Sequence, residues 1–447
     1  MNMCFHLLII GLLLCGTVTG ARAQADTLRE QSVSVREKIP ALPIVRILVT
    51  GNRHTKTPII LREMKTQVGD TLDIETLQAD QKRILNLGLF NRVEIDSLQR
   101  PEGLHILVGV TERLYFLPFP IFFITDRDWS KISFGAGVVH TNFRGRSEIL
   151  AVSGWAGYNP ALQVDYSNPW LFGPAQLLTS LRFFAQRVAS RSLESSMKDV
   201  NEKYLGGYWS IGRRFNLFTY LSLSFGYTEL KYDPPVSGKT LDPSGHDRLP
   251  SLGVVFTFDK RDLFEYPRSG VLVKLWARRN GFTSNYIHYL RYGADLRGYQ
   301  KIYRGLSLGG RVMTDLSHDP IPLYDRVFLG YANRVRGNFY QRREGENLAM
   351  ASVELRFPIL PWRYFSLSDV PMFAAYMQNM KFGISAGIFA DYGQTWFQGR
   401  HPDFSNGLRG FGAGLHIHLP YIYLLRLELG FDEHGHVERI ADIGVAF

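Results

Sequence analysis

The stretch KFGISAGIFADYG, from Lys381 to Gly393, alternates between two kinds of residue. Its even-numbered positions are apolar, and most of its odd-numbered positions are polar, charged or glycine. Successive side chains of a β-strand point to opposite faces, so the pattern predicts a strand with one apolar and one polar face. Such a strand suits a wall between lipid and an interior filled with water or polar side chains.

Two other segments alternate in the same way and add charges to the polar face. MASVELRFP, at 350–358, places Glu354 opposite its apolar positions, and YLLRLELGFD, at 423–432, does so with Arg426 and Glu428. A soluble β-sandwich packs its apolar faces into a core and seldom carries so many charges on the opposite faces. The pattern therefore favours an antiparallel barrel that crosses a membrane and holds charges inside.

The residues from Leu114 to Phe447 leave room for roughly sixteen strands, at about ten residues per strand and a similar allowance per connection. The segment 358–380 is a long connection on the inner side and departs from the usual pattern of short inner turns. Long connections expected on the outer side are 188–202, 232–248, 317–347 and 394–407. The predicted fold class is mainly β, a transmembrane antiparallel β-barrel of about 16 strands.

The N-terminus has the features of an export signal. An apolar run before an A-x-A pattern ending at Ala23 predicts a signal peptide at 1–23, followed by a linker at 24–42. A lipoprotein signal ending at Cys15 is the alternative. Cys4 and Cys15 are the only cysteines, so cleavage after Ala23 leaves no thiol for a disulfide, a metal or a nucleophile.

Composition and spacing disfavour several other classes of function. The 51 Lys and Arg residues exceed the 41 Asp and Glu residues, but they are dispersed along an exported chain, so no nucleic-acid partner is predicted. No glycine-rich phosphate cradle is evident, and the chain is predicted not to be an enzyme and to need no cofactor. A membrane lipase that assembles Ser and His from different strands is the alternative. The pairs His416 with His418 and His434 with His436 lack an evident third ligand, so no metal site is predicted.

The segment 43–113 has a different periodicity and is predicted to be a separate small α+β domain. A strand at Ile44–Asn52 is followed by apolar residues at helical spacing in Lys56–Lys65 and Ile74–Phe90. Two alternating runs around a turn at Pro101–Gly103 then predict a hairpin. The expected order is strand, helix, helix, strand, strand (βααββ).

This order of elements resembles a POTRA domain, the periplasmic module of the BamA/TamA outer-membrane assembly family, and VTGN (49–52) and LGLFNRVEI (87–95) match its motifs. The chain is identified as a member of that family, with one POTRA domain at 43–113 and a bacterial surface antigen barrel at 114–447. The resemblance implies a bacterial outer-membrane location, with the POTRA domain in the periplasm. Four barrel stretches carry it in the family's order: DKRDLFEYPRSG (259–270), VRGNFY (335–340), ELRFP (354–358) and ADYGQTW (390–396).

In this family the motif that VRGNFY matches lies on an outer loop that folds back into the barrel. The resemblance implies that Arg336 pairs there with acids of the inner wall, which are Glu354 and Asp391 in this sequence. With Gly337 they form a predicted lid-loop lock, because a planar guanidinium can bridge two carboxylates. Asn338 stands where the family usually has an aromatic residue. The predicted tip of the lid loop comprises Val335, Asn338, Phe339 and Tyr340.

The resemblance extends to the end of the chain. The final Phe447, at the end of a strand predicted at 437–447, is similar to the aromatic residue by which outer-membrane barrels are recognised for insertion. Arg342 and Arg343 are instead predicted to be solvated or to attract lipid headgroups. The barrel motif that precedes the lid loop is marked by Asp259, Arg261, Pro267 and Gly270.

The resemblance implies a non-enzymatic component that assembles, inserts or translocates outer-membrane proteins. Its expected partners are unfolded outer-membrane protein clients or an exported protein, accessory periplasmic or lipoprotein subunits, and outer-membrane lipids. The first and last strands are expected to meet at a weak seam where a client strand can pair, since Pro118 and Pro120 lack amide donors. A single POTRA domain favours an accessory member. The alternatives are a two-partner secretion transporter, a passive porin and a surface structural barrel.

Overall fold

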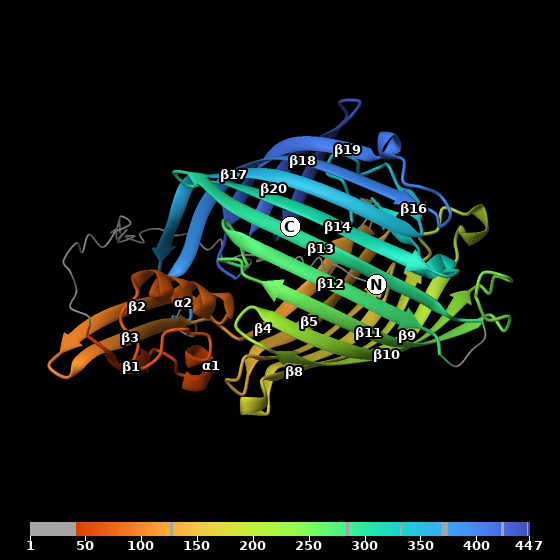
Figure 1. The fold of residues 1–447 in the computed structure, drawn as a ribbon. Helices are drawn as coiled ribbons and strands as arrows, with labels where there is room; N and C mark the ends of the chain where they lie inside the picture. The colour runs from red at the N-terminus through yellow and green to blue at the C-terminus, as the bar shows by residue number, and fades with distance from the viewer. Residues whose placement is uncertain are drawn as a thin grey trace.

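The computed structural model describes residues 42–125, 128–282, 286–330, 333–367, 374–421, 424–444 and 446–447. The predicted signal peptide and the predicted linker, apart from Leu42, lie outside these residues. The described chain forms a small α+β domain at one end of a large β-barrel, as Figure 1 shows. None of its helices combines the length and the apolar character that a membrane-crossing helix needs.

The small domain has the predicted order of elements. Its sheet runs β1-β3-β2, with β1 parallel and β2 antiparallel to β3. Asp73 caps α2 by accepting a hydrogen bond from the Glu75 amide, and Pro58 occupies the first turn of α1, where an amide donor is not needed. The elements are β1 (Ile44–Thr50), α1 (Thr57–Leu61), α2 (Ile74–Asn86), β2 (Phe90–Arg100) and β3 (Gly103–Glu112).

A single antiparallel sheet of 16 strands forms the barrel, which confirms the predicted fold class. Neighbours in the sheet follow one another along the chain, because antiparallel strands need only short connections. The strands are β4 (Phe116–Ile124), β5 (Ile132–Phe143), β6 (Glu148–Gly157), β7 (Ala161–Leu171), β8 (Leu177–Ala189), β9 (Asn201–Arg214), β10 (Thr219–Asp233), β11 (His246–Asp259), β12 (Gly270–Asn280), β13 (Tyr289–Tyr303), β14 (Leu306–His318), β17 (Asn347–Phe365), β18 (Met380–Trp396), β19 (Leu408–His418), β20 (Leu425–Asp432) and β21 (Val437–Ile443).

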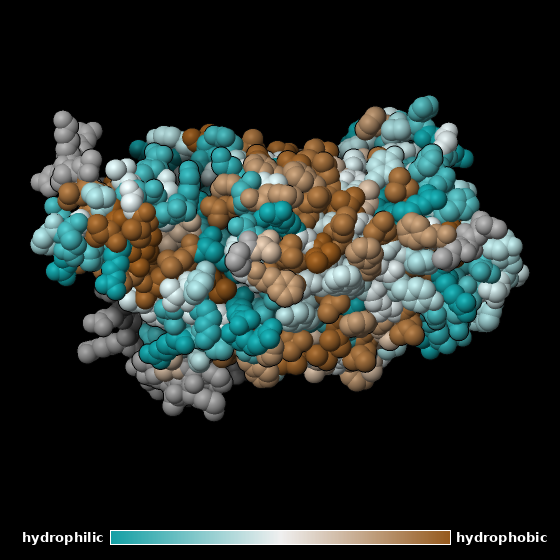
Figure 2. Space-filling model, turned by 60° about the horizontal axis from the view of Figure 1, so that its bottom comes forward, coloured by the Kyte–Doolittle hydropathy of each residue, from teal (hydrophilic) through white to brown (hydrophobic). Residues whose placement is uncertain are grey.

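The barrel wall sorts its side chains as the alternation predicts. On β18 the inward Asp391 is 7% exposed, whereas the outward Ile388 is 54% exposed. Figure 2 shows hydrophobic side chains gathered over the middle of the wall and hydrophilic ones toward the outer loops. Such an apolar band suits contact with lipid. Other exposed members of the band are Phe183, Leu205, Val312 and Phe411.

The sheet begins at β4 and ends at β21, and these two strands share no hydrogen-bonded ladder within the described residues. Pro118 and Pro120 lie in β4, which therefore lacks two amide donors. The barrel thus contains two strand edges that are not joined to each other by a ladder.

The last strand is shorter than predicted. β21 ends at Ile443, because Gly444 adopts a left-handed φ of +90° and the chain turns inward. The Gly444 carbonyl accepts a hydrogen bond from Arg426 Nε at 2.6 Å. Phe447 is 2% exposed and stacks on Tyr299, with 6.3 Å between ring centroids. The C-terminal residue therefore lies inside the barrel rather than in its wall.

The predicted long inner connection at 358–380 is partly strand, since β17 continues into it as far as Phe365 and pairs there with the start of β18 at Met380. A register shift beside Pro358 interrupts the alternation that would otherwise have indicated these strands. The hairpin reaches the small domain, where Asn91 Nδ2 donates to the carbonyls of Tyr376 and Gln378, both at 2.9 Å. It therefore acts as an arm that holds the small domain.

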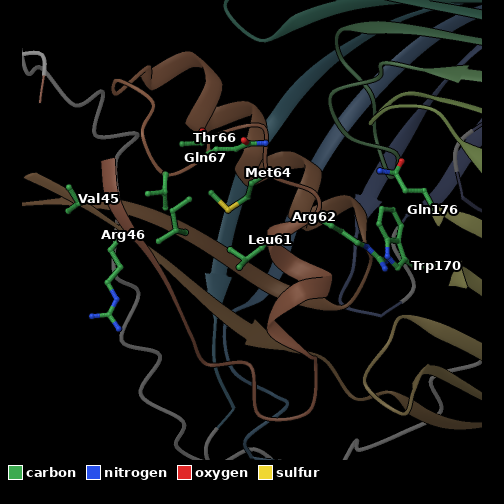
Figure 3. Close-up of a pocket in the computed structure, with 11 residues that line it drawn as sticks. Val45, Arg46, Leu61, Arg62, Met64, Thr66, Gln67, Trp170 and Gln176 are labelled. Atoms are coloured by element: carbon green, nitrogen blue, oxygen red, sulfur yellow. The ribbon is translucent and has the colours of Figure 1, made fainter. Parts of the chain in front are cut away.

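The small domain also rests against shorter inner connections. The Lys56 amide donates to the Gly145 carbonyl, between β5 and β6, at 2.9 Å. Glu63 accepts two hydrogen bonds from Arg214 at the end of β9, at 2.8 and 2.7 Å. A cavity of about 500 Å³ lies at this junction, and Trp170 of the barrel helps to line it (Figure 3). These contacts fix the small domain at the inner end of the barrel.

Candidate functional site: the lid loop in the barrel lumen

The connection between β14 and β17, residues 319–346, is called the lid loop here. Its tip, residues 333–340, folds into the barrel, and Val335 to Asn338 are buried. Arg343, predicted to be solvated, is exposed. The lid loop contains the 3-10 helix η4 (Leu323–Asp325) and an antiparallel pair of short strands, β15 (Val327–Leu329) and β16 (Arg343–Gly345).

Apolar contacts hold the lid loop against the inner wall. Leu329 is 0% exposed and Val335 is 1% exposed. Burying a side chain of this size stabilises a structure by about 1.5–3 kcal/mol. The wall residues of this apolar cluster are Met313, Leu348, Met350 and Leu408.

Arg336 lies against Asp391, and three hydrogen bonds join the two residues. Nε donates to Oδ2 at 2.7 Å, Nη2 donates to Oδ1 at 2.9 Å, and the Arg336 amide donates to Oδ2 at 3.2 Å. A two-point guanidinium–carboxylate contact fixes orientation as well as distance. The structure thus brings the first predicted pair of residues together.

Arg336 also reaches two glutamates. Its Nη1 donates to Glu354 Oε2 at 2.8 Å and to Glu428 Oε1 at 3.0 Å. The sequence predicted the pairing with Glu354 but not the one with Glu428, although the alternation places Glu428 on the inner face. The guanidinium carbon lies 3.6 Å from the centre of the Phe389 ring, a cation–π contact. Phe389 is the apolar exception on the inner face of β18.

The charge of Arg336 is strongly favoured in this setting. Burial alone would lower its pKa, but the hydrogen bonds and charge of Asp391, together with the charges of Glu354 and Glu428, raise the pKa above its ordinary value. Arg336 is 5% exposed, so water screens these contacts little. The arginine is therefore a permanently charged, directional anchor of the lid tip.

Gly337 lets the lid backbone approach the wall closely. Its amide donates to Glu438 Oε2 at 2.8 Å, a contact that sequence reasoning missed. Its φ is +96°, and an added side chain would collide with the backbone of Phe431. Glycine is therefore required here for two reasons, backbone conformation and space.

The rest of the tip passes from the wall to the exterior. Asn338 is buried and its Nδ2 donates to the Arg409 carbonyl at 2.8 Å, so it uses a polar contact where an aromatic residue was expected. Phe339 meets Tyr340 edge to face, with 5.0 Å between ring centroids. Tyr340 is 81% exposed, so it is not part of the buried contact.

Further side chains extend the cluster, and sequence reasoning gave them no partners. Arg356 Nε donates to Glu354 Oε1 at 2.6 Å, and Arg426 Nη1 donates to Glu428 Oε2 at 2.8 Å. His416 Nε2 lies 3.4 Å from Glu428 Oε1. Buried charges persist where they are paired. Three arginines here face three carboxylates: Arg336, Arg356 and Arg426 against Glu354, Asp391 and Glu428.

The predicted barrel motif forms the inner turn between β11 and β12, residues 260–269. Arg261 pairs with Asp259 through two side-chain hydrogen bonds, at 2.9 and 2.7 Å. The Pro267 carbonyl accepts a hydrogen bond from Arg356 Nη1 at 3.2 Å, so the turn touches the charged cluster. Gly270, with a φ of +103°, begins β12 beside the turn.

Among the residues that the structure describes, two groups of side chains could hold a metal ion by composition, with ligand atoms within 4.8 Å of one another. One is Asp432 with His434 and His436, and the other is His416 with two glutamates of the charged cluster. Sequence reasoning missed the acidic members. Asp432 already accepts hydrogen bonds from two backbone amides of its turn, and the glutamates accept hydrogen bonds from Arg336. These contacts account for both groups without a metal.

Sequence reasoning found no G-x-S-x-G motif of hydrolases, which is wrong, because the stretch GISAG at 383–387 fits it. Ser385 Oγ lies 3.2 Å from His418 Nε2. Ser385 stands in the middle of β18 rather than at a strand-to-helix turn. His418 Nδ1 has no hydrogen-bond partner among the described residues, so no third group orients the imidazole. The geometry therefore does not support a nucleophilic serine.

Comparison with known families assigns the barrel and the small domain. The model of the Omp85 superfamily domain matches residues 142–440. The chain belongs to the Omp85 superfamily. The POTRA model, described as surface antigen variable number repeat, matches residues 43–113. An Omp85 barrel with a POTRA domain lies in the outer membrane, with the POTRA domain in the periplasm.

Individual relatives of this Omp85 chain are distant. The outer membrane protein assembly factor BamA of Nitratidesulfovibrio vulgaris is 19% identical over 319 residues, which cover 66% of this chain and 37% of that protein. The chain therefore spans little more than a third of that relative.

Two solved structures share the fold. The crystal structure of Haemophilus ducreyi BamA lacking POTRA domains 1–3 superposes with a TM-score of 0.53 at 17% identity, covering 90% of this chain and 84% of that one. CdiB from Acinetobacter baumannii superposes with a TM-score of 0.51 at 14% identity, covering 90% and 73%. The Omp85 chain thus has the barrel of a BamA/TamA-family member with a single POTRA domain.

Proposed function

We propose that this Omp85 protein is a non-enzymatic component that inserts client proteins into the outer membrane, as an accessory member of the assembly family. The observation that carries the proposal is the lid tip, which Arg336 holds in the lumen through Asp391, Glu354 and Glu428. Arg336, Gly337, Glu354 and Asp391 are the predicted lid-loop lock, and Glu428 is a further carboxylate that binds Arg336.

The lock favours the closed lid by a free energy that the binding of a partner can overcome. Removing one partner from a buried ion pair costs about 3–5 kcal/mol, since the other charge stays buried without compensation. The closed lid is therefore favoured, and a client or partner that binds the open state better shifts the balance. Tyr340 is the exposed part of the tip.

The edges of β4 and β21 support entry of client strands at this seam. An unpaired strand edge offers amides and carbonyls to an incoming strand, which is β-augmentation. Pro118 and Pro120 weaken the competing contact between the barrel's own ends. The partners we propose are unfolded outer-membrane clients, accessory periplasmic or lipoprotein subunits, and lipids along the apolar band. Phe447 is proposed as the chain's own insertion signal.

A two-partner secretion transporter is the second candidate, because the same lid and barrel suit the export of one polypeptide. The superposition with CdiB supports a shared fold for both candidates and does not separate them. A passive porin is disfavoured, because the lid tip and Phe447 both occupy the lumen.

Depletion of this protein in its native host distinguishes the assembly component, the secretion transporter and the porin. We expect several outer-membrane barrel proteins to disappear from the membrane proteome, with unchanged uptake of small solutes, and wild-type protein but not Arg336→Ala to restore them. Loss of one secreted protein with an intact barrel proteome supports the secretion transporter instead. An intact proteome with altered solute uptake contradicts both and supports a porin.

A further inference from the structure

The turn at 260–269 contacts both the POTRA domain and the charged cluster. On the POTRA side, Asn86 at the end of α2 makes two reciprocal hydrogen bonds with it. Asn86 Nδ2 donates to the Asp262 carbonyl at 3.1 Å, and the Phe264 amide donates to Asn86 Oδ1 at 2.9 Å. An amide side chain that both donates and accepts fixes the turn in two directions.

The turn is internally rigid. Asp262 Oδ1 accepts hydrogen bonds from the amides of Leu263, Arg268 and Ser269, at 3.0, 2.9 and 3.1 Å. The Asp262 amide also donates to the Ser269 carbonyl at 3.0 Å. A displacement at one end of the turn is therefore carried to the other rather than absorbed within it.

On the lumen side, a first chain of hydrogen bonds, called a route here, leads from Tyr266 to Arg336 of the lid loop. It is 4% exposed, and its hydroxyl lies 2.9 Å from His416 Nδ1. The other ring nitrogen of His416 faces Glu428, which binds Arg336 at 3.0 Å. A carboxylate only accepts, so Nε2 donates to it, and in the neutral imidazole Nδ1 then accepts a hydrogen bond from the Tyr266 hydroxyl. This order of donors makes the route from Tyr266 to Arg336 continuous.

A second route starts one residue later and ends on the same arginine. The Pro267 carbonyl accepts from Arg356 Nη1 at 3.2 Å, and Arg356 Nε donates to Glu354 Oε1 at 2.6 Å. Glu354 Oε2 accepts from Arg336 Nη1 at 2.8 Å. The guanidinium of Arg356 also lies 5.0 Å from the centre of the Tyr266 ring, so the two routes support each other.

We propose that the 260–269 turn couples the docking of POTRA helix α2 to closure of the lid loop, with Tyr266 and Arg356 as positioning residues for Arg336. A client or subunit that draws α2 away from the turn loosens both routes and favours the open lid. The inference deepens the proposed function of the lid and rests on it. Coupling of this kind requires an element with two states whose equilibrium is shifted from both sites. In this proposal the element is the lid loop, and its two states are open and closed.

The test reads lid opening directly, in full-length protein in membranes and without a client. Val335 is 1% exposed under the closed lid, so a single cysteine at Val335→Cys reacts with a polar maleimide only when the lid lifts. Both native cysteines lie in the predicted signal peptide. The variants are Asn86→Ala and Tyr266→Phe. Asn91→Ala is the matched control, because it also removes two POTRA–barrel hydrogen bonds but at the β17–β18 hairpin.

We expect Asn86→Ala and Tyr266→Phe each to raise the labelling rate about three- to tenfold, the effect of losing one or two net hydrogen bonds. Their combination should raise it by less than the product of the single effects, and Asn91→Ala should leave it unchanged. An unchanged rate in Asn86→Ala overturns the proposal. Equal increases in Asn86→Ala and Asn91→Ala overturn it too, because they reveal loose docking in general. Neither result depends on whether depletion removes any client.

Discussion

At the scale of single residues, Arg336 concentrates the interactions that hold the lid. One guanidinium contacts three carboxylates and an aromatic ring while it is 5% exposed. The surrounding charges balance, so the cluster is stable only when the arginine is present. Neutralising this residue leaves three buried carboxylates facing only two arginines, Arg356 and Arg426.

Replacing Arg336 by alanine should therefore destabilise the folded barrel. We expect Arg336→Ala to lower the free energy of unfolding by about 3–5 kcal/mol, measured by urea unfolding in lipid vesicles. Arg400→Ala is the control, since Arg400 is an exposed arginine of another outer loop and should change stability by less than about 0.5 kcal/mol. Equal effects of the two variants would mean that a wet lumen screens the cluster.

Much of this residue-level picture is accessible from the sequence, and the reason is the period of two in a strand. Alternation places Glu354, Asp391 and Glu428 on the inner face. It does not say which of them meet, because that depends on barrel curvature and on strand register. Arg336 itself was selected by family resemblance, since loop residues follow no period. Tyr266 was missed for the same reason.

At the scale of elements, the β17–β18 hairpin is the feature that distinguishes this barrel's inner side. It projects past the wall and holds β2 of the POTRA domain through Asn91, while Arg92 Nη1 donates to Asn379 Oδ1 at 3.2 Å. The Arg92 guanidinium also lies 5.1 Å from the centre of the Tyr364 ring. The sequence did not predict the end of β17, because Pro358, Pro361 and two register shifts interrupt the alternation there.

Removing this arm should loosen one side of the POTRA domain. We expect the double variant Asn91→Ala and Arg92→Ala to speed hydrogen exchange of the β2 amides about tenfold or more, because three hydrogen bonds of about 1 kcal/mol each are lost. Exchange in α1 should stay unchanged, since Glu63 still binds Arg214. The surface variant Arg46→Ala serves as the control. Exchange in β2 that matches the control would show that the hairpin does not hold the domain.

At the scale of the whole molecule, contacts run without a break from the POTRA domain in the periplasm to the lid loop on the outer side. The POTRA domain meets inner connections on several sides of the barrel, the 260–269 turn enters the lumen, and the lid descends from the outside to meet the same cluster. No local pattern could predict this arrangement, because it depends on how two separately folded domains sit together. The ends of the sheet, β4 and β21, remain the proposed place where clients enter.

Photo-crosslinking at this seam tests most directly whether clients enter between β4 and β21. A photo-crosslinking amino acid is placed at Phe122 of β4, and in a second strain at Val254 of β11, outward positions that are 38% and 37% exposed. Irradiation follows a pulse of labelled newly synthesised outer-membrane proteins. We expect adducts with these proteins from Phe122 and none from Val254. Equal adducts from both positions, or none from Phe122, would contradict the claim that clients enter between β4 and β21.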